Sequence, residues 1–575
     1  MKAKLSGLAI GVGLLALALH WPAVRNGFTH WDDNLYLELA GKYRVSWAGV
    51  WWAFTNTYIY YHPLTWLSHG LDCAVWGLQP AGHHAQSVVW HALNAGLVVV
   101  LAWQLSKWAA PWDDLERLCL AGWVGLVFAV HPLQVEAVAW VAGRKTLVSA
   151  FFSLLALCAY VRWAAAEEQR RWWWAMVAAY VAALLSKPMA VPLPVVFLAL
   201  DIFPLRRTAA RGWGKLIREK WLLFGLAGFV SLLTIIGQTG TGALSAIQMG
   251  PGTRVLVAMR SLVFYVWKLA WPAWLSPFYP LGEWNDLRQP EFIVPAVLIV
   301  GVTALLVGGW RRWPAGAAAG LAYLAWVLPV SGVLQAGGQA VADRFAYLPV
   351  VPALLLMAGG LVWLRQRLGG LGKGVLLVAV GGHLIWLCAR TQEQIPVWQD
   401  DVTLWQAVIA HYPNSPVEHR FVAQALIGQE RFAEALPYAE ISFQQQTGDA
   451  ESRKLLGAVY HDIAVSFVKQ REFGKCLPVA RRAVELNGAD AVARAAVGLS
   501  LLKLGQPAEA ARELEQVVQQ RADLPAVHYN LACAYAGLGR LPAAAEMLRL
   551  AVAADPSLAK LAARDPALAA IQEVR

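Results

Sequence analysis

Two adjacent carboxylates near the start of the chain are the residues whose chemistry stands out. Asp32 and Asp33 lie in the stretch HWDDNLYL, shortly after the first apolar run, residues 5–19. That run carries no charge and follows Lys2 and Lys4, which predicts a transmembrane helix that begins in the cytoplasm. The pair would then lie at the outer surface of the membrane, where carboxylates can take a proton from a substrate or bind a metal. A solvated acidic loop is the alternative.

Cationic side chains occur in short segments between later apolar runs. Arg144 and Lys145 end the segment HPLQVEAVAWVAGRK, Lys187 lies in a Ser-Lys-Pro turn, and Arg344 lies in QAGGQAVADRFAYLP. Cations gathered near carboxylates suit a substrate that carries phosphate. Lys145 and Lys187 could instead extend their charged ends to the membrane interface.

The same segments contain four further polar residues that an inert anchor would not need: His62, His131, Glu136 and Asp343. His62 lies in the first expected outer loop, and His131 and Glu136 lie in the second. Each has a structural alternative: His131, which precedes a proline, could end a helix, and Asp343 and Arg344 could form a structural ion pair.

The composition predicts a membrane protein. The chain has 575 residues, of which 58% are hydrophobic and 15% are charged, and it contains 30 tryptophans; an ordinary soluble globule is excluded. The net charge is +11, but the basic residues concentrate in short loops between apolar runs, which fits the positive-inside rule better than nucleic-acid binding. The first apolar run has no small-residue cleavage site after it, so we interpret it as a retained anchor.

The order of apolar stretches and basic loops predicts the topology. Counting from the cytoplasm, seven stretches up to residue 237 place the first outer loop at 22–83 and the most basic loop, 204–220, inside. Segment 254–275 is interrupted by three basic residues and a proline, which favours a re-entrant or interfacial segment over a span. Four later stretches then give about eleven spans, with the polar clusters and the chain from residue 391 onward outside. A spanning 254–275 would invert that last conclusion.

The last third of the chain repeats. Residues 501–518 align with 535–552 at a shift of 34, which places Gly505 on Gly539, and residues 473–484 lie 34 earlier with Arg471 in place of the glycine. A period of 34 is the signature of tetratricopeptide repeats, which stack helix pairs into a superhelix with a concave binding face. The sequence therefore predicts an all-α protein, with a membrane domain over 1–390 and a tetratricopeptide-repeat solenoid over 391–575.

Six segments in series carry a family resemblance. The chain resembles the transmembrane-and-tetratricopeptide-repeat O-mannosyltransferases of animals and their bacterial relatives, and it is more distantly similar to other membrane glycosyltransferases that use lipid-phosphate sugar donors. The resemblance covers essentially the whole chain, including the order of membrane half and repeats. The segments are WDDNLYL, YYHPLTWLSHGLDCAVWGLQPAGHHAQSVVWHALNA, HPLQVEAVAWVAGRK, LLSKPMAVPLPVVFLALDIFPL, VFYVWKLAWPAWLSPFYP and GGQAVADRFAYLP.

The resemblance implies an inverting protein O-glycosyltransferase. One carboxylate of the first outer loop, Asp32 or Asp33, would act as general base on a serine or threonine hydroxyl, because that hydroxyl is a poor nucleophile near neutral pH. The other would orient the base, contact the backbone of the acceptor or assist a divalent metal. The sugar would come from a polyprenyl-phosphate carrier, whose leaving phosphate needs cations: Arg144, Lys145, Lys187 and Arg344. The repeats would hold the protein acceptor.

Two other classes of function remain open at this stage. A membrane-anchored tetratricopeptide scaffold would not need Asp32 or Asp33, and a glycan polymerase or flippase would handle polyprenyl-linked sugars without a protein acceptor. The expected location is the cytoplasmic membrane, with the repeats on its extracytoplasmic side.

Overall fold

The computed structural model describes residues 1–56, 61–166, 169–240, 250–281, 290–333, 338–446 and 448–572. They fold into helices, and contacts divide the chain into two compact units, Met1–His411 and Tyr412–Arg575. The predicted all-α class is confirmed. Composition had suggested a boundary at 390, but helix α19 (Asp401–His411) packs on the short helix η8 (Ile395–Trp398) and so belongs with the first unit.

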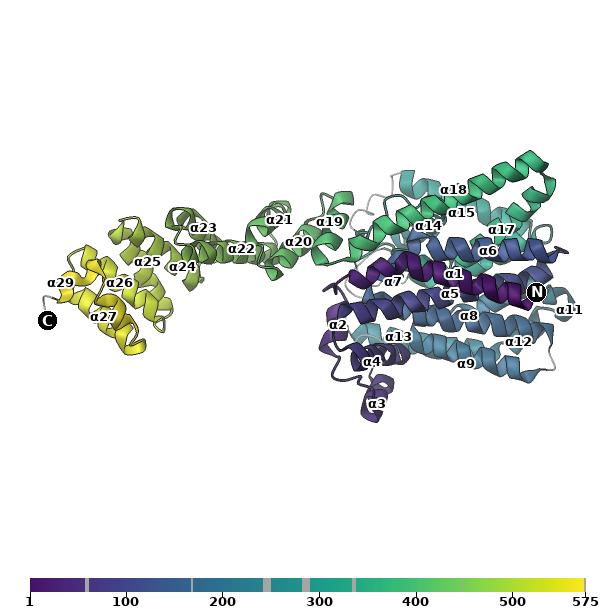
Figure 1. Ribbon diagram of the computed structural model, residues 1–575, viewed down its shortest axis with the longest axis horizontal. Helices are drawn as coiled ribbons and strands as arrows, with labels where there is room; N and C mark the ends of the chain where they lie inside the picture. The colour runs from purple at the N-terminus through teal and green to yellow at the C-terminus, as the bar shows by residue number, and fades with distance from the viewer. Residues whose placement is uncertain are drawn as a thin grey trace. The chain divides into compact units, whose positions relative to one another are not determined.

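The first unit is built around a group of neighbouring long helices. Helix α5 packs against α1, α6 and α8, and α8 packs against α9 (Figure 1). Small residues permit the close approach that helix pairs in membranes use: a Cβ at Gly13 would lie 3.0 Å from the Ala92 carbonyl oxygen, and one at Gly125 only 2.2 Å from a Val99 methyl. The bounds are α1 Lys2–His20, α5 Pro80–Ala109, α6 Asp114–Val130, α8 Arg144–Ala165 and α9 Arg170–Ser186.

Fewer helices than expected have the length and composition of a membrane span. Among the described residues four stretches qualify, or six if each of two bent helix pairs is one span, whereas about eleven were expected. Other apolar stretches fold into shorter helices, such as Pro188–Ile202 and Pro314–Val330, which fall below the length of this criterion, so the count of about eleven stays a prediction. Segment 254–275 falls largely in helix α14 (Pro251–Ala270), which does not meet the criterion either. The four stretches are Lys2–Arg25, Pro80–Ala109, Val141–Ala165 and Gly370–Trp398.

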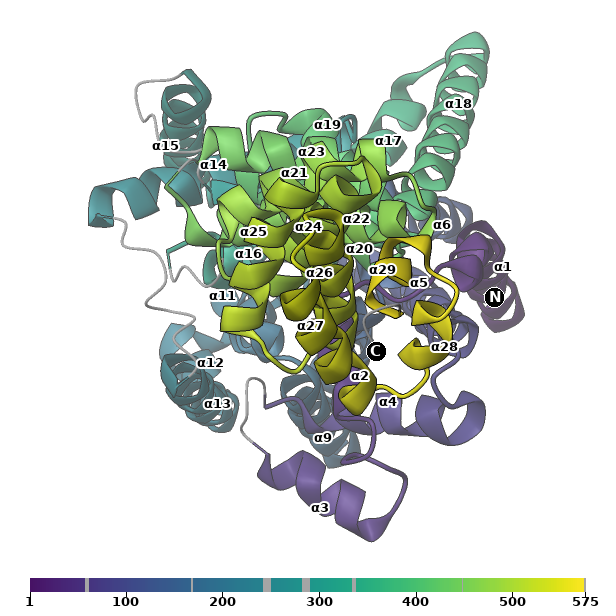
Figure 2. The ribbon, with the colours of Figure 1, turned by 90° about the vertical axis from the view of Figure 1, so that its left-hand side faces the viewer.

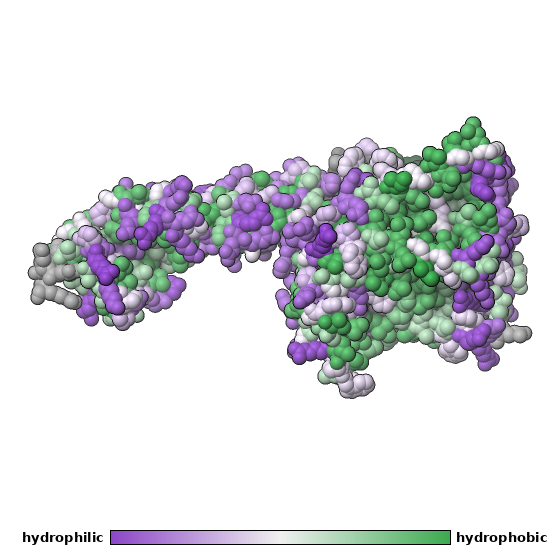
Figure 3. Space-filling view, viewed as in Figure 1, coloured by the Kyte–Doolittle hydropathy of each residue, from purple (hydrophilic) through white to green (hydrophobic). Residues whose placement is uncertain are grey.

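The surface of the first unit has the character of a membrane protein. Figure 3 shows hydrophobic residues over the middle of this unit and hydrophilic residues toward both ends. Large exposed apolar side chains include Leu305 on α15 (Pro290–Gly308) and Val378 on α18 (Gly370–Gln394), 76% and 75% exposed. Because α1 and α15 lie on opposite sides of the unit (Figure 2), apolar surface faces outward in more than one direction, as a surrounding bilayer requires.

The two ends of this unit differ in the loops that they carry. The N-terminus and helix α11 (Arg207–Arg211), part of the basic loop, lie at one end, and the short helices α2 (Asp33–Glu38) and α4 (Pro63–Trp76) lie at the other (Figure 1). The basic loop and the carboxylate pair are therefore on opposite ends, as the positive-inside count expects.

The segment just before Asp32 is tied to residues near the end of the first unit. The Gly27 amide donates to the Gln399 carbonyl at 2.8 Å, and the Asn26 side chain donates to the Ile395 carbonyl at 3.2 Å. The His30 amide donates to the Asp401 carboxylate at 2.7 Å. These contacts fix the entry into helix α2.

The second unit consists of helix pairs with the predicted period. The second helices of three pairs begin at Phe473, Pro507 and Leu541, which are 34 residues apart. At equivalent positions Cys476, Ala510 and Ala544 are completely buried. The segment before these pairs, residues 416–445, also forms a helix pair. The pairs are α20 Pro416–Gly428 with α21 Phe432–Gln445, α22 Ala450–Lys469 with α23 Phe473–Leu486, α24 Ala491–Lys503 with α25 Pro507–Gln520, and α26 Pro525–Gly537 with α27 Leu541–Ala554.

The turns inside these pairs explain the alignment of Arg471 with two glycines. Gly505 and Gly539 have φ of 77° and 74°, and Arg471 adopts the same left-handed conformation with φ of 60°. Glu430 occupies the corresponding turn of the first pair with φ of 58°. Glycine adopts this left-handed conformation without steric cost, whereas a residue with a Cβ is strained in it.

Candidate functional site

Asp32 is the carboxylate that remains accessible. It precedes helix α2, its side chain is 25% exposed, and its Oδ2 lies 3.1 Å from Nζ of the buried Lys145. Burial alone would raise the pKa of Asp32, but the charge and hydrogen bond of Lys145, with smaller contributions from Arg344 and Lys187, hold that pKa below its ordinary value. Asp32 is thus an ionised carboxylate that a substrate can reach.

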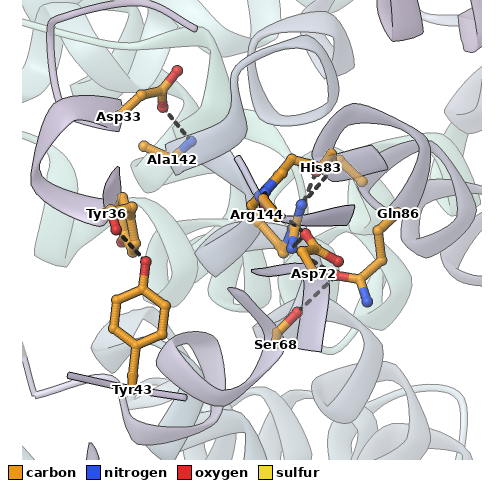
Figure 4. A network of polar contacts seen from close by, with 11 residues as sticks. Asp33, Tyr36, Tyr43, Ser68, Asp72, His83, Gln86, Ala142 and Arg144 are labelled. Carbon is orange, nitrogen blue, oxygen red and sulfur yellow. Dashed lines mark hydrogen bonds and ion pairs between the residues drawn. The ribbon is translucent and has the colours of Figure 1, made fainter. Parts of the chain in front are cut away.

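Asp33 is buried and its carboxylate is fully engaged by the protein. Oδ1 accepts the Ala142 amide at 2.8 Å (Figure 4), and Oδ2 accepts the Thr29 amide at 3.0 Å and the Thr29 hydroxyl at 3.2 Å. Burial raises the pKa of Asp33 to about 7, against the opposing effect of these hydrogen bonds. Asp33 is therefore held in place by three hydrogen bonds, whereas Asp32 keeps an accessible carboxylate.

Three of the four predicted cations gather around Asp32. Lys187 follows helix α9, is buried, and donates to the Thr146 hydroxyl at 2.9 Å. Burial, together with the charges of Lys145 and Arg344, lowers the pKa of Lys187 well below its ordinary value. An anion placed among these cations would relieve their mutual repulsion, so the cluster is electrostatically suited to a phosphate group.

Arg344 is held by a carboxylate and by aromatic rings. Its guanidinium pairs with Glu136, whose other oxygen accepts the Arg344 amide at 2.6 Å, and lies 5.0 Å from the centre of the Trp140 ring. The ion pair considered with Asp343 is therefore formed with Glu136 instead. Trp140 in turn stacks on Trp31, whose ring centre is 5.0 Å away, so aromatic rings support this side of the cluster.

His62 and Asp343 border the same cluster. His62 precedes helix α4, and burial together with the charges of Lys145 and Lys187 lowers its pKa well below the usual range. Asp343 accepts a hydrogen bond from the Tyr279 hydroxyl at 2.8 Å, and burial and the nearby Glu136 raise its pKa well above the usual range. His62 is therefore a neutral imidazole, and Asp343 is a carboxyl that resists ionisation. The net charge of the cluster is determined by its other residues.

Arg144 and His131 are placed elsewhere. Arg144 is completely buried, pairs with Asp72 and donates to Gln86 at 2.6 Å (Figure 4). It also donates to the Ser87 hydroxyl at 3.3 Å. The structure thereby separates it from the cations around Asp32. His131 ends helix α6, where its Nδ1 accepts the Leu133 amide at 3.2 Å and its Nε2 lies 3.0 Å from the Leu269 carbonyl oxygen. It is the helix-end histidine of the structural alternative.

A large apolar cavity lies among the helices of the first unit. It has a volume of about 630 Å³ and is lined mainly by aliphatic side chains of helices α5, α8, α10 (Leu193–Ile202), α16 (Pro314–Val327) and α17 (Val350–Arg367). Trp326 and Leu348 line both this cavity and a small pocket that contains Lys187 and Thr146. The cavity therefore approaches Lys187 at one edge, and elsewhere it is lined by Pro204, at the start of the basic loop.

Sequence reasoning missed a second polar group, formed by His69, Asp72 and His83 beside Arg144. The only signal in the sequence is the spacing of His69 and Asp72, three residues apart, which places both on one helical face. That His83 of another helix meets them is a tertiary fact.

Known proteins are similar to both the membrane half and the repeat half of the chain. A tetratricopeptide-repeat family model matches residues 501–564. Human protein O-mannosyl-transferase TMTC1 is 23% identical over 449 residues, 70% of this chain and 50% of its own, and human TMTC3 is 23% identical over 504 residues, 80% of this chain and 53% of its own. This confirms the resemblance to the transmembrane-and-tetratricopeptide-repeat O-mannosyltransferases. The chain spans about half the length of these curated relatives.

Among solved structures, the tetratricopeptide-repeat protein YrrB is 24% identical over 27% of this chain and 76% of its own, with a TM-score of 0.22. A similarity at this level carries no further conclusion.

Proposed function

We propose that this membrane protein is a protein O-glycosyltransferase that moves a sugar from a polyprenyl-phosphate donor to serine or threonine hydroxyls. The observation that carries the proposal is the arrangement at the end of the first unit: the accessible, ionised Asp32 stands beside Lys145, Lys187 and Arg344, and an apolar cavity approaches Lys187 at one edge. The names of the human relatives support the reaction class.

The arrangement suits a single displacement at the anomeric carbon. Asp32 accepts the proton of the acceptor hydroxyl as its oxygen forms the new bond to the sugar, and the bond to the donor phosphate breaks with its electron pair on phosphate oxygen. Lys145, Lys187 and Arg344 stabilise the charge that grows on the leaving phosphate. Attack opposite the leaving group inverts the anomeric configuration.

The apolar cavity suits the lipid part of the donor. Its volume, about 630 Å³, accommodates part of a polyprenyl chain, and the shared residues Trp326 and Leu348 bring one edge of it to the pocket of Lys187. A lipid chain there would direct its phosphate to the cations.

We also propose that the repeats recruit the protein acceptor and that the enzyme lies in the cytoplasmic membrane, with its active site and repeats on the extracytoplasmic side. A concave face is the general binding surface of such repeats. The orientation is supported by the N-terminus, which carries Lys2 and Lys4, and by helix α11 of the basic loop, because both lie at the opposite end of the first unit from helix α2 (Figure 1).

The direct test is incubation of membranes that contain the protein with a polyprenyl-phosphate sugar labelled in the sugar. We expect the label to enter protein, on serine or threonine. Label in glycan alone would favour a polymerase, and no transfer to either acceptor would favour a scaffold. Membranes prepared without expression of this chain provide the background.

Replacing Lys145 with methionine is expected to move the acidic limb of the pH profile of transfer to higher pH by about one to three pH units. The base works in its ionised form, which is lost as the pH falls through the pKa of Asp32. Because Lys145 holds that pKa below 3.8 against the effect of burial, its removal raises the pKa. A parallel loss of rate at every pH, with the limb unmoved, would contradict the role of Asp32; exposed Lys42→Met is the control.

A further inference from the structure

Three metal-ligating side chains meet between helices α4 and α5, away from the carboxylate of Asp32. His69 and Asp72 lie on α4, and His83 lies in the first turns of α5 (Figure 4 labels the last two). One ligand atom from each residue lies within 4.8 Å of the other two, and the residues are 0%, 0% and 2% exposed. Among the residues that the structure describes, no second group of three or more histidine, cysteine or carboxylate ligands lies this close together.

Several polar atoms of this group lack a hydrogen-bond partner among the described residues. They are both ring nitrogens of His69, Nδ1 of His83 and Oδ1 of Asp72. Buried polar atoms are almost always satisfied, and four orphaned atoms in one small volume point to a bound species.

The protonation state of His83 follows from its surroundings. Its Nε2 lies 3.0 Å from the carbonyl oxygen of Gly77, which can only accept, so Nε2 carries the proton. In the neutral imidazole Nδ1 then presents a lone pair, and it lies 3.3 Å from Oδ2 of Asp72, a second acceptor. Two facing acceptors need a positive species between them, either a second proton on the ring or a metal ion. A histidine that donates its far N–H to a backbone carbonyl is also the usual support of a metal-binding imidazole.

Arg144 does not supply that cation to the histidines. It donates to Asp72, to the His83 carbonyl oxygen and to Gln86, so it orients the carboxylate and helix α5 but pairs with none of the imidazole nitrogens. Hydrogen-bonded carboxylates are likewise typical of metal sites.

We propose that His69, Asp72 and His83 bind a divalent transition-metal ion, of which Zn²⁺ is the expected one, and that the ion joins helix α4 to the start of α5. Two imidazoles and one carboxylate are a ligand set that zinc accepts, whereas Mg²⁺ and Ca²⁺ prefer oxygen ligands alone. The site is independent of the proposed transferase reaction.

The ion would fix the first outer loop. His62, at the start of α4, borders the cation cluster, so a bond between α4 and α5 would hold that border in place. The site would be structural, because its ligands are closed off from solvent.

The test is metal analysis of the full-length protein, purified in detergent through a tag without histidine and dialysed against metal-free buffer. We expect about one zinc per chain in the wild type and at least about tenfold less in His69→Gln and His83→Gln. His84→Gln is the matched control, because His84 is buried and adjacent in sequence but bonds the Gly27 carbonyl at 3.0 Å and is outside the group. It should keep its zinc.

A second measurement is independent of whether the variants fold. A chelator should lower the thermal midpoint of the wild type, and added Zn²⁺ should restore it, because an ion that binds only the folded state stabilises that state. Wild-type protein that carries no zinc and gains no stability from Zn²⁺ would overturn the proposal. So would equal zinc content in the wild type, His69→Gln and His83→Gln, which would show binding elsewhere.

Discussion

The variant Asp32→Asn is expected to lower sugar transfer by about 10²- to 10⁴-fold while the protein accumulates in the membrane at its normal level. Asparagine keeps the shape of the side chain and its contact with Lys145 but cannot accept the proton of the acceptor hydroxyl. The Asp32 side chain is partly exposed, and an amide oxygen in its place can still accept the hydrogen bond of the buried Lys145, so we expect the fold to be retained.

Asp33→Asn is expected to act differently. An amide nitrogen would have to replace one oxygen that now accepts an N–H group, either that of Ala142 or that of Thr29. Two donors would then face each other inside the protein, so the expected result is less folded protein.

The measurement compares the transfer rates of the two variants, each normalised to the amount of folded protein. The control is Asp114→Asn, because Asp114 is exposed at the start of helix α6. If Asp33→Asn were folded but inactive and Asp32→Asn fully active, the roles assigned to the two carboxylates would be exchanged.

Arg144→Met is expected to destabilise the first unit by about 3–5 kcal/mol. The substitution leaves the carboxylate of Asp72 buried and without its ionic partner, and it removes the hydrogen bonds to Gln86 and Ser87. Denaturant titration of the purified protein, followed by tryptophan fluorescence, measures the change.

The control is Arg117→Met, since Arg117 is partly exposed and its ion pair with Asp114 spans 3.4 Å at the surface, where a loss of at most about 1 kcal/mol is expected. A stable Arg144→Met protein that used the donor poorly would restore Arg144 to the phosphate site that its sequence position suggested.

The contrast between Arg144 and Lys145 shows where sequence reasoning stops. The two residues are adjacent in helix α8, and both were expected to contact phosphate. Successive residues of a helix point in directions about 100° apart, so Lys145 reaches Asp32 while Arg144 reaches Asp72. Residue types and order could indicate the segments, but only the packed helices decide which side chain faces the site.

The repeats could be predicted more completely because their information is local. A period of 34 residues fixes small buried residues such as Ala510 and Ala544 and the left-handed turns at Gly505 and Gly539. The number of spans could not be predicted in the same way, since hydropathy reports composition, whereas helix length depends on prolines and on packing.

The contacts between residues 26–30 and 395–401 have a consequence for the order in which this protein matures. His30 and Asp401 are 371 residues apart, so at roughly 5–20 residues per second the ribosome adds Asp401 on the order of 20–70 s after His30. For most of that interval the segment that leads into Asp32 has left the ribosome but lacks the partners that fix it. The nascent chain therefore cannot assemble this site before translation has passed the first unit.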